Sequence, residues 1–186
     1  MNISGTGRAA PVLSLLFVMS GVAAALLFPV IEIAGSLYLY GDGSAFSYGI
    51  AVGDTWNIHW RNIPVRLFAY LYAIWPAEAV VALTGKAQAG LLVYAGLRAG
   101  AQAIGLLITF ICDRSAGRVI FVMACASTAL LCPLVAGFPT EMWIAHAVYW
   151  PCLALAFHAP RRPGGFVALA LAVVALCLSH EGGMVM

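Results

Sequence analysis

Two aspartates, a histidine and an arginine stand close together in YLYGDGSAFSYGIAVGDTWNIHWR, residues 38–61. Asp42 and Asp54 are the carboxylates, and His59 and Arg61 follow them. A carboxylate partly removed from water could act as a general base toward a hydroxyl group, while neighbouring cations fix an anionic partner. A hydrated turn with aromatic anchors would explain the same residues without chemistry.

A second candidate is Arg98, near the middle of an apolar run over residues 88–112. Tyr94, Arg98 and Gln102 are spaced four residues apart, so on a helix they form one polar stripe. A charge at that depth must face the interior of a helix bundle, a carboxylate or a water-filled cavity. The guanidinium group could therefore hold a phosphate, form half of a buried ion pair, or snorkel toward the membrane surface.

Two further polar groups stand at the ends of apolar runs. In FPTEMWIAH, residues 138–146, Glu141 opens a predicted helix, where helix capping alone would explain it. In LSHEGG, residues 178–183, His180 and Glu181 stand just before two glycines that end a helix, and a solvated helix end is the simpler interpretation. Both groups are candidate substrate-binding positions.

The histidines and cysteines give no metal-binding spacing. The four histidines contain no HxxxH or HExxH pattern, and none of the five cysteines belongs to a CxxC pair. No P-loop, GxGxxG or GxSxG motif occurs either. The net charge of +2 comes without a basic run. We predict no cofactor, no metal and no nucleic-acid partner, and nothing in the pattern supports a divalent ion.

The rest of the chain must position these residues inside a membrane. Of 186 residues, 63% are apolar and 9% are charged, whereas an average soluble domain has about 25% charged residues. A helix needs roughly 20 apolar residues to cross the hydrocarbon core of a bilayer. We predict an all-α polytopic membrane protein with about five or six transmembrane helices. The clear spans are 11–37, 88–112, 119–137, 142–159 and 165–179.

Residues 66–85 form the one ambiguous run, because they are long enough to cross but contain Glu78. If this run crosses, most basic loop residues lie outside the cell; if it lies along the outer surface, most lie inside. Loop Lys and Arg prefer the cytoplasm, which favours the second layout with a cytoplasmic N-terminus. It predicts a large external loop over residues 38–87 with amphipathic juxtamembrane helices. The alternative is a spanning helix in which Glu78 pairs with Arg98.

The favoured layout gathers most acidic residues at one side of the membrane. Only Asp113 is placed at the cytoplasmic side. The groups placed at or beyond the outer face are Glu32, Asp42, Asp54, Glu78, Glu141, His180 and Glu181.

This arrangement resembles the N-terminal region of the GT-C class of membrane glycosyltransferases, which use polyprenyl-phosphate sugars. The shared features are an aspartate just after the first helix (YLYGDGSAFSYG), basic and aromatic juxtamembrane helices (HWRNIPVRLFAYL), and acids at the outer ends of later spans (FPTE, LSHEGG). The resemblance implies that the first-loop aspartate is the catalytic base, which maps onto Asp42, with Asp54 as second choice. It also implies that basic residues bind the lipid-linked phosphate. The substrate-binding candidates are His59, Arg61, Arg66, Arg98, Glu141, His180 and Glu181.

We therefore expect a glycosyltransferase in the bacterial inner membrane that takes sugar from a polyprenyl-phosphate donor on the outer face, with membrane lipid and that donor as partners. The alternative is a non-catalytic transporter or assembly subunit with a buried polar network of Arg98, Glu78 and Glu141. Two features differ from GT-C members: Gly43 follows Asp42 where many have a second acid, and members usually have more spans. We also expect that residues 1–186 are one helical membrane domain from the N-terminal part of a longer protein.

Overall fold

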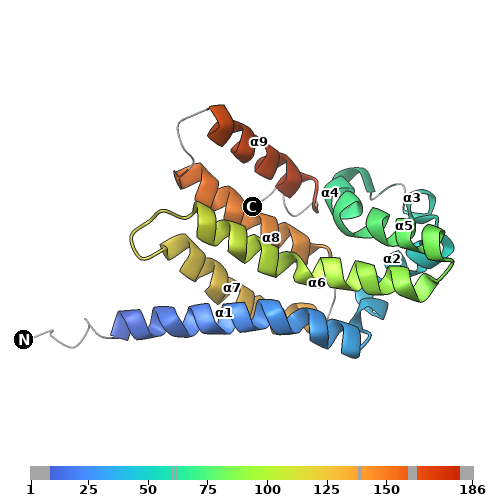
Figure 1. Ribbon diagram of the computed structural model, residues 1–186, viewed down its shortest axis with the longest axis horizontal. Coiled ribbons are helices and arrows are strands. Elements are labelled where there is room, and N and C mark those ends of the chain that lie inside the picture. The colour runs from blue at the N-terminus through green and yellow to red at the C-terminus, as the bar shows by residue number, and fades with distance from the viewer. Residues whose placement is uncertain (1–8, 60, 62, 138–139, 159–162, 181–186) are drawn as a thin grey trace, which may run out of the picture.

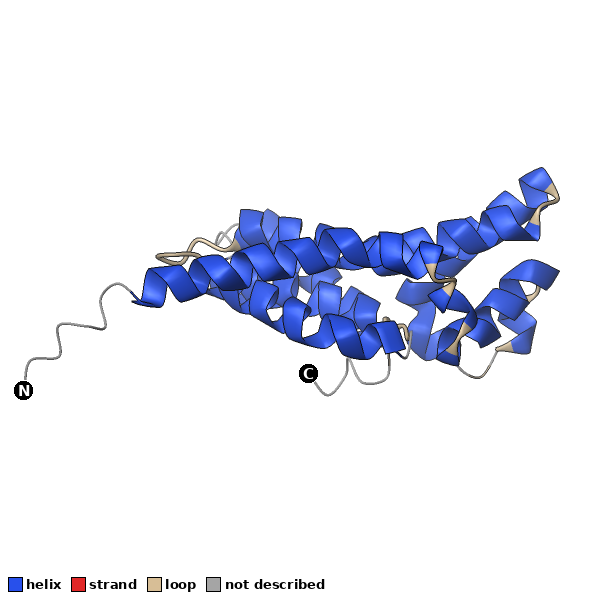
Figure 2. Ribbon diagram, turned by 90° about the horizontal axis from the view of Figure 1, so that it is seen from below, coloured by secondary structure: helices blue, strands red, loops and turns tan. Residues whose placement is uncertain are grey.

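The computed structural model describes residues 9–59, 61, 63–137, 140–158 and 163–180, and every regular element in these ranges is helical (Figure 1, Figure 2). The predicted all-α fold is confirmed, and each clear span corresponds to one helix of a bundle. These bundle helices are α1 (Ala9–Ala34), α6 (Ala87–Cys112), α7 (Val119–Gly137), α8 (Met142–His158) and α9 (Pro163–Cys177).

The bundle has the exterior of a membrane protein. Large apolar side chains face outward, for example Leu16 on α1, Leu130 on α7 and Leu171 on α9, which are 55%, 72% and 65% exposed. Such surfaces are stable in lipid, where helices satisfy their own backbone groups. Among the described residues, four helical segments are long and apolar enough to cross a membrane. They are Pro11–Ala34, Ile63–Thr84, Ala87–Cys112 and Val119–Ala136.

Contacts between α1 and α6 show that these helices run in opposite directions. Glu32, near the end of α1, pairs with Arg98 in α6. Ala25, earlier in α1, belongs to the same core cluster as Leu106, later in α6. The end of α1 and the start of α6 therefore lie at the same end of the bundle (Figure 1). The segment between them therefore begins and ends at the same end of the bundle, and part of it, Ile63–Thr84, is long and apolar enough to cross a membrane.

That segment folds into short helices gathered at one end of the bundle, which we call the α2–α5 unit (residues 37–84). Gly53 and Gly85 end its two longer helices with φ values of 70° and 67°, which glycine adopts without steric cost. Its elements are the turns η1 (Leu37–Leu39) and η2 (Ile63–Arg66), the π-helical η3 (Tyr70–Ile74), and the helices α2 (Gly41–Val52), α3 (Thr55–Ile58), α4 (Leu67–Ala69) and α5 (Trp75–Thr84).

The α2–α5 unit packs closely on the first half of α6. A Cβ atom at Gly90 would lie 2.7 Å from the Ala77 carbonyl oxygen and 2.3 Å from the Val81 side chain, so only glycine permits this approach of α5. Ile50 of α2 and Tyr94 of α6 are both completely buried in the same core cluster. The unit is therefore held by a continuous apolar core.

Glu78 lies within the α2–α5 unit and does not reach Arg98. Its Oε1 accepts a hydrogen bond from the backbone N–H of Thr55 at 3.0 Å, and its Oε2 accepts one from the Tyr70 hydroxyl at 3.1 Å. Arg98 pairs with Glu32 instead. The alternative in which Glu78 pairs with Arg98 is wrong, because α5 packs beside the start of α6 rather than along its middle.

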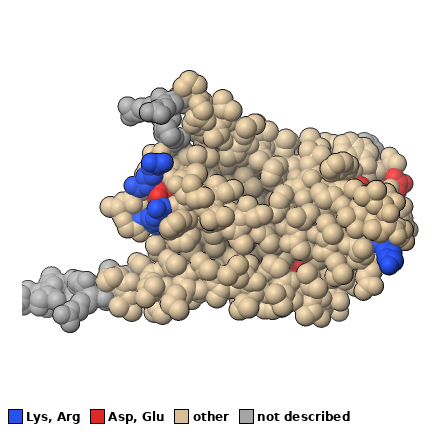
Figure 3. Space-filling model, viewed as in Figure 1, with Lys and Arg blue, Asp and Glu red and all other residues tan. Residues whose placement is uncertain are grey.

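Charged side chains mark the two ends of the bundle. On the face shown in Figure 3, the visible Lys and Arg side chains lie near the two ends of the molecule. Lys86, before α6, is exposed at the α2–α5 end, and Arg114 is exposed in the loop between α6 and α7 at the opposite end. This is the distribution expected when the middle of a bundle is surrounded by hydrocarbon.

Candidate functional site

The ring of Phe46 in α2 lies close to two of the predicted site residues, and a third precedes it in the same helix. The centroid of its ring lies 4.8 Å from that of His59 and 6.0 Å from the guanidinium carbon of Arg66. Asp42 stands four residues before Phe46 in the same helix, and this spacing places both on one face, one turn apart. The fold thus brings His59 and Arg66 to the Phe46 ring, and Asp42 precedes that ring by one turn of α2.

Asp42 is a half-buried carboxylate in the first turn of α2. Gly41, with a φ of 54°, turns the chain into this helix, and a negative charge is favoured at a helix N-terminus. His59 is held nearby by a contact of 3.2 Å between its Nε2 and the carbonyl oxygen of Ala45. Asp42 therefore has partial access to solvent one helical turn before Phe46, the residue whose ring contacts His59 and Arg66.

Arg66 joins this surface to the bundle interior. Its Nη1 lies 3.3 Å from Oε2 of Glu141, with 13% of the Arg66 side chain and 1% of the Glu141 side chain exposed. The Tyr94 hydroxyl donates to Oε1 of the same carboxylate at 3.1 Å. Burial raises the pKa of Glu141 above its ordinary value, while the charges of Arg66 and Arg98 oppose that rise. Glu141 therefore holds the Arg66 side chain from the interior of the bundle.

Arg98 and Glu32 form a completely buried ion pair between α6 and α1. The guanidinium carbon of Arg98 also lies 5.7 Å from the centroid of the Tyr94 ring. The predicted stripe of Tyr94, Arg98 and Gln102 faces the bundle interior, because all three are buried. Arg98 Nε and Nη1 and Glu32 Oε2 find no hydrogen-bond partner in the described part of the chain. Of the roles left open for Arg98, the ion pair is the one observed.

A second polar cluster continues from Gln102 deeper into the bundle. Gln102 Nε2 donates to the carbonyl oxygen of Trp143 at 3.0 Å and lies 2.8 Å from His146 Nδ1. His146 Nε2 contacts Ser127 Oγ at 2.7 Å and Trp150 Nε1 at 3.1 Å. Sequence reasoning missed this cluster, because isolated serine and glutamine residues in apolar helices show no pattern that links them.

The remaining predicted residues are more peripheral. Asp54 is exposed and accepts a hydrogen bond of 2.6 Å from Asn57 Nδ2. Arg61 is exposed, and His180 is half-buried after the end of α9. Glu181 lies outside the described residues. No hydrogen bond or ion pair found among the described residues joins Asp54 to the buried carboxylates.

At the opposite end of the bundle, a carboxylate is held by backbone N–H groups. Asp113 accepts hydrogen bonds of 2.9 Å from the backbone N–H groups of Ser115 and Phe121, and His158 Nε2 lies 3.4 Å from its Oδ1. Burial alone would raise the pKa of Asp113, but hydrogen bonds from Ser115 and Phe121 outweigh it and lower that pKa. Both carboxylate oxygens of Asp113 therefore accept hydrogen bonds that hold the loop between α6 and α7.

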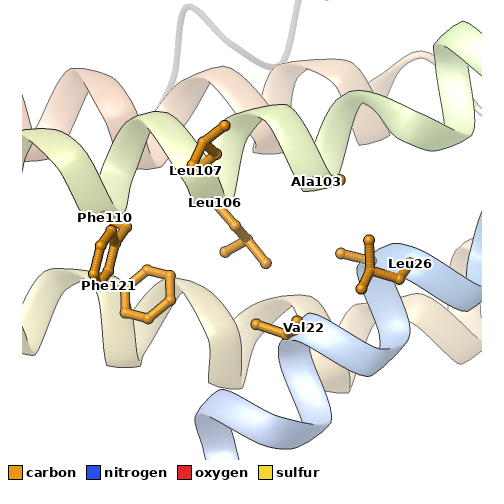
Figure 4. A pocket seen from close by; sticks show the side chains of 8 residues that line it. Val22, Leu26, Ala103, Leu106, Leu107, Phe110 and Phe121 are labelled. Atoms are coloured by element: carbon orange, nitrogen blue, oxygen red, sulfur yellow. The ribbon is translucent and has the colours of Figure 1, made fainter.

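An apolar cavity of about 210 Å³ lies between α1, α6 and α7 (Figure 4). Its lining includes no polar side chain, so it offers no group for catalysis. The side chains labelled in Figure 4 are Val22, Leu26, Ala103, Leu106, Leu107, Phe110 and Phe121.

Neither a metal cluster nor a relative identifies the site. Within the described ranges, no group of three or more His, Cys, Asp and Glu side chains is placed to hold a metal ion. Comparison of the chain with protein-family models, with curated proteins and with solved structures gave no match. The function has to be argued from the side chains themselves.

Proposed function

We propose that this membrane protein transfers a sugar from a polyprenyl-phosphate donor, as its resemblance to GT-C glycosyltransferases implies. The observation that supports the proposal is that Arg66 lies over Phe46, with its guanidinium carbon 6.0 Å from the centroid of the ring, while the half-buried Asp42 stands one helical turn before Phe46 in α2. A base and an anion-binding cation at one site are the two groups that such a transfer needs.

Asp42 takes the proton from the hydroxyl group of the acceptor. The hydroxyl oxygen then bonds to the anomeric carbon of the sugar, and the bond between that carbon and the phosphate oxygen breaks. The leaving group is polyprenyl phosphate, whose negative charge lies near Arg66. A half-buried aspartate suits this role, because it is partly desolvated and still reachable from water.

Glu141 and Tyr94 position Arg66 rather than touching the substrate. Glu141 is 1% exposed and Tyr94 is completely buried, so neither is available to a ligand at the surface. Arg98 is likewise enclosed and paired with Glu32. In this proposal the buried residues stabilise the site, and Asp42, Arg66 and His59 face the substrate.

The proposed orientation places the α2–α5 unit outside a bacterial inner membrane. Arg114 and Arg118 stand in the loop between α6 and α7 at the other end of the bundle. Basic residues in short loops favour the cytoplasm. The same orientation leaves the N-terminus in the cytoplasm and places Asp42 where an acceptor outside the cell can reach it.

Donor turnover by purified protein in lipid vesicles tests this proposal. Vesicles containing the protein, a polyprenyl-phosphate sugar labelled in the sugar, and a membrane extract as the source of acceptors should convert the donor to polyprenyl phosphate and labelled product. Vesicles without the protein give the background rate. An intact donor in both samples contradicts the proposal.

A non-catalytic membrane subunit is the second candidate. The observation in its favour is that the two inner cations are balanced by carboxylates, Arg98 by Glu32 and Arg66 by Glu141. Buried ionisable residues in membrane bundles often pair in this way. This candidate differs from the first in assigning no role to Asp42.

A further inference from the structure

We infer that a pocket between α2 and α5 binds the primary ammonium group of a membrane lipid headgroup. The inference does not depend on the proposed function, because the pocket lies at the opposite end of α2 from Asp42. Asp42 and Val52 are ten residues apart in that helix, a separation of about 15 Å along its axis. The lining includes Ala51, Val52 and Gly53 from the end of α2, and Tyr70, Trp75 and Glu78 from η3 and α5.

Glu78 gives the pocket a half-buried carboxylate. Its two oxygens accept hydrogen bonds from the backbone N–H of Thr55 and from the Tyr70 hydroxyl, which are both neutral donors. The ion pairs found in the described part of the chain do not include Glu78. Because each carboxylate oxygen has two lone pairs, each can accept one further hydrogen bond. Glu78 therefore keeps both its charge and two acceptor positions for a cation.

The end of α2 adds partial negative charge to the same pocket. The carbonyl groups of the last turn of a helix carry about half a negative charge, which favours cations there. Gly53 ends the helix with a φ of 70°. Within the described ranges, no backbone N–H that follows α2 donates to the carbonyl oxygens of Ala51 and Val52. These two oxygens are acceptors for a donor that enters the pocket.

Aromatic side chains surround the pocket at the surface. Tyr70 and Trp75 line it, and Trp56 packs edge-on against Tyr70, with ring centroids 5.4 Å apart. The face of an aromatic ring attracts a cation. Val52 and Trp75 are 52% and 56% exposed, so the pocket opens to the surroundings of the protein. Exposed tryptophan is typical of the level of lipid headgroups, which favours a lipid over an amine dissolved in water.

A primary ammonium group suits these acceptors better than a quaternary one. Its three N–H donors can bond to Glu78 and to the two carbonyl oxygens at the end of α2, whereas a trimethylated nitrogen has no donor. The volume of the pocket is about 440 Å³. An ammonium group with two methylene groups needs about 90 Å³ if each takes the volume of a water molecule. The ethanolamine headgroup of a phospholipid has this chemistry and this size.

Titration calorimetry of the purified full chain in detergent with lysophosphatidylethanolamine tests the inference. This lipid should bind about tenfold or more tightly than lysophosphatidylcholine of the same chain length, because only its nitrogen donates charged hydrogen bonds. Phosphoethanolamine has the same ammonium group without the chain and should bind about tenfold or more weakly than the lipid. Equal affinity for the two lipids would overturn the ammonium site. Equal affinity for phosphoethanolamine would overturn the lipid as its source.

Two substitutions of the exposed Val52 form a matched pair. Val52→Lys brings an ammonium group of the protein into the pocket and should weaken binding of lysophosphatidylethanolamine by about tenfold or more. Val52→Met adds similar length without charge and should bind as the wild type does. Trp75→Leu removes one aromatic face and should weaken binding roughly three- to tenfold. Its control is Tyr48→Leu, at an exposed tyrosine of α2 outside the pocket.

Several outcomes with these variants count against the inference. They are wild-type affinity in Val52→Lys, equal loss in Val52→Lys and Val52→Met, and equal effects of Trp75→Leu and Tyr48→Leu. Thermal unfolding of each variant in detergent should match that of the wild type, because all three positions are exposed. A loss of binding then reports on the pocket rather than on the fold.

Discussion

Tyr94 donates a hydrogen bond of 3.1 Å to Glu141, a residue 47 positions later in the chain. The bond joins the first half of α6 to the turn that precedes α8, and the same carboxylate contacts Arg66. One buried acid thus connects the bundle interior to the α2–α5 unit. The stability of the proposed site depends on this connection.

Tyr94→Phe should destabilise the protein, because it removes a donor from a buried carboxylate. We expect a loss of about 1 to 3 kcal/mol in the free energy of unfolding. Thermal unfolding of the purified protein in detergent measures the change. Tyr48→Phe is the control, since Tyr48 is 63% exposed. Equal effects of the two substitutions would show that the hydrogen bond to Glu141 contributes nothing.

Arg98 and Glu32 should be strongly coupled in a double-mutant cycle. Arg98→Met leaves Glu32 as an unpaired buried acid, and we expect a loss of about 3 to 5 kcal/mol. The double variant with Glu32→Met should recover most of that loss, because no uncompensated charge remains. Additive effects in the same unfolding measurement would contradict the pairing. Arg114→Met, at an exposed arginine, should have little effect.

Asp113 should stabilise the protein only above acidic pH. Its folded-state pKa is lowered by hydrogen bonds from Ser115 and Phe121. A lowered pKa of a carboxyl group gives stability that is present above the unfolded-state pKa, about 3.9 for Asp, and is lost as the pH falls through the folded-state value. The difference in melting temperature between wild type and Asp113→Asn should therefore be present near neutral pH and shrink in acid. A difference that grows in acid would contradict the lowered folded-state pKa of Asp113.

The α2–α5 unit should lie entirely on one side of the membrane. Single cysteines at exposed positions Tyr48 and Lys86, in a background without the five native cysteines, should react with a membrane-impermeant maleimide from the same side. A cysteine at Ala116, in the loop between α6 and α7, should react only from the other side. Labelling of positions 48 and 86 from opposite sides would mean that residues 63–84 cross the bilayer.

Much of the fold could be predicted from the sequence, because apolar length and loop charge are local properties. They gave the bundle helices and the inward-facing stripe around Arg98. The carboxylates with which Arg66 and Arg98 pair could not be predicted. Glu32, Glu78 and Glu141 were all placed near one membrane face, and only packing decides that Arg98 meets Glu32 and that Arg66 meets Glu141, 75 residues away.

The contact of Arg66 with Phe46, one turn after Asp42, was equally hidden. It depends on Phe46, an apolar residue without any motif, and on the short turn η2, which carries no recognisable helix signal. The sequence marked Asp42 and Arg66 as candidates but gave no reason to place Arg66 against the helix that carries Asp42.

The most direct test of the proposed function compares Asp42→Asn with Asp54→Asn in the donor-turnover assay. Both substitutions replace a carboxylate by an amide of the same size in the α2–α5 unit, so they are matched. With Asp42 as the general base, Asp42→Asn should lower turnover by roughly 10² to 10⁴, while Asp54→Asn, at an exposed residue bonded to Asn57, should stay near the wild-type rate. Wild-type turnover in correctly inserted Asp42→Asn protein would contradict the account.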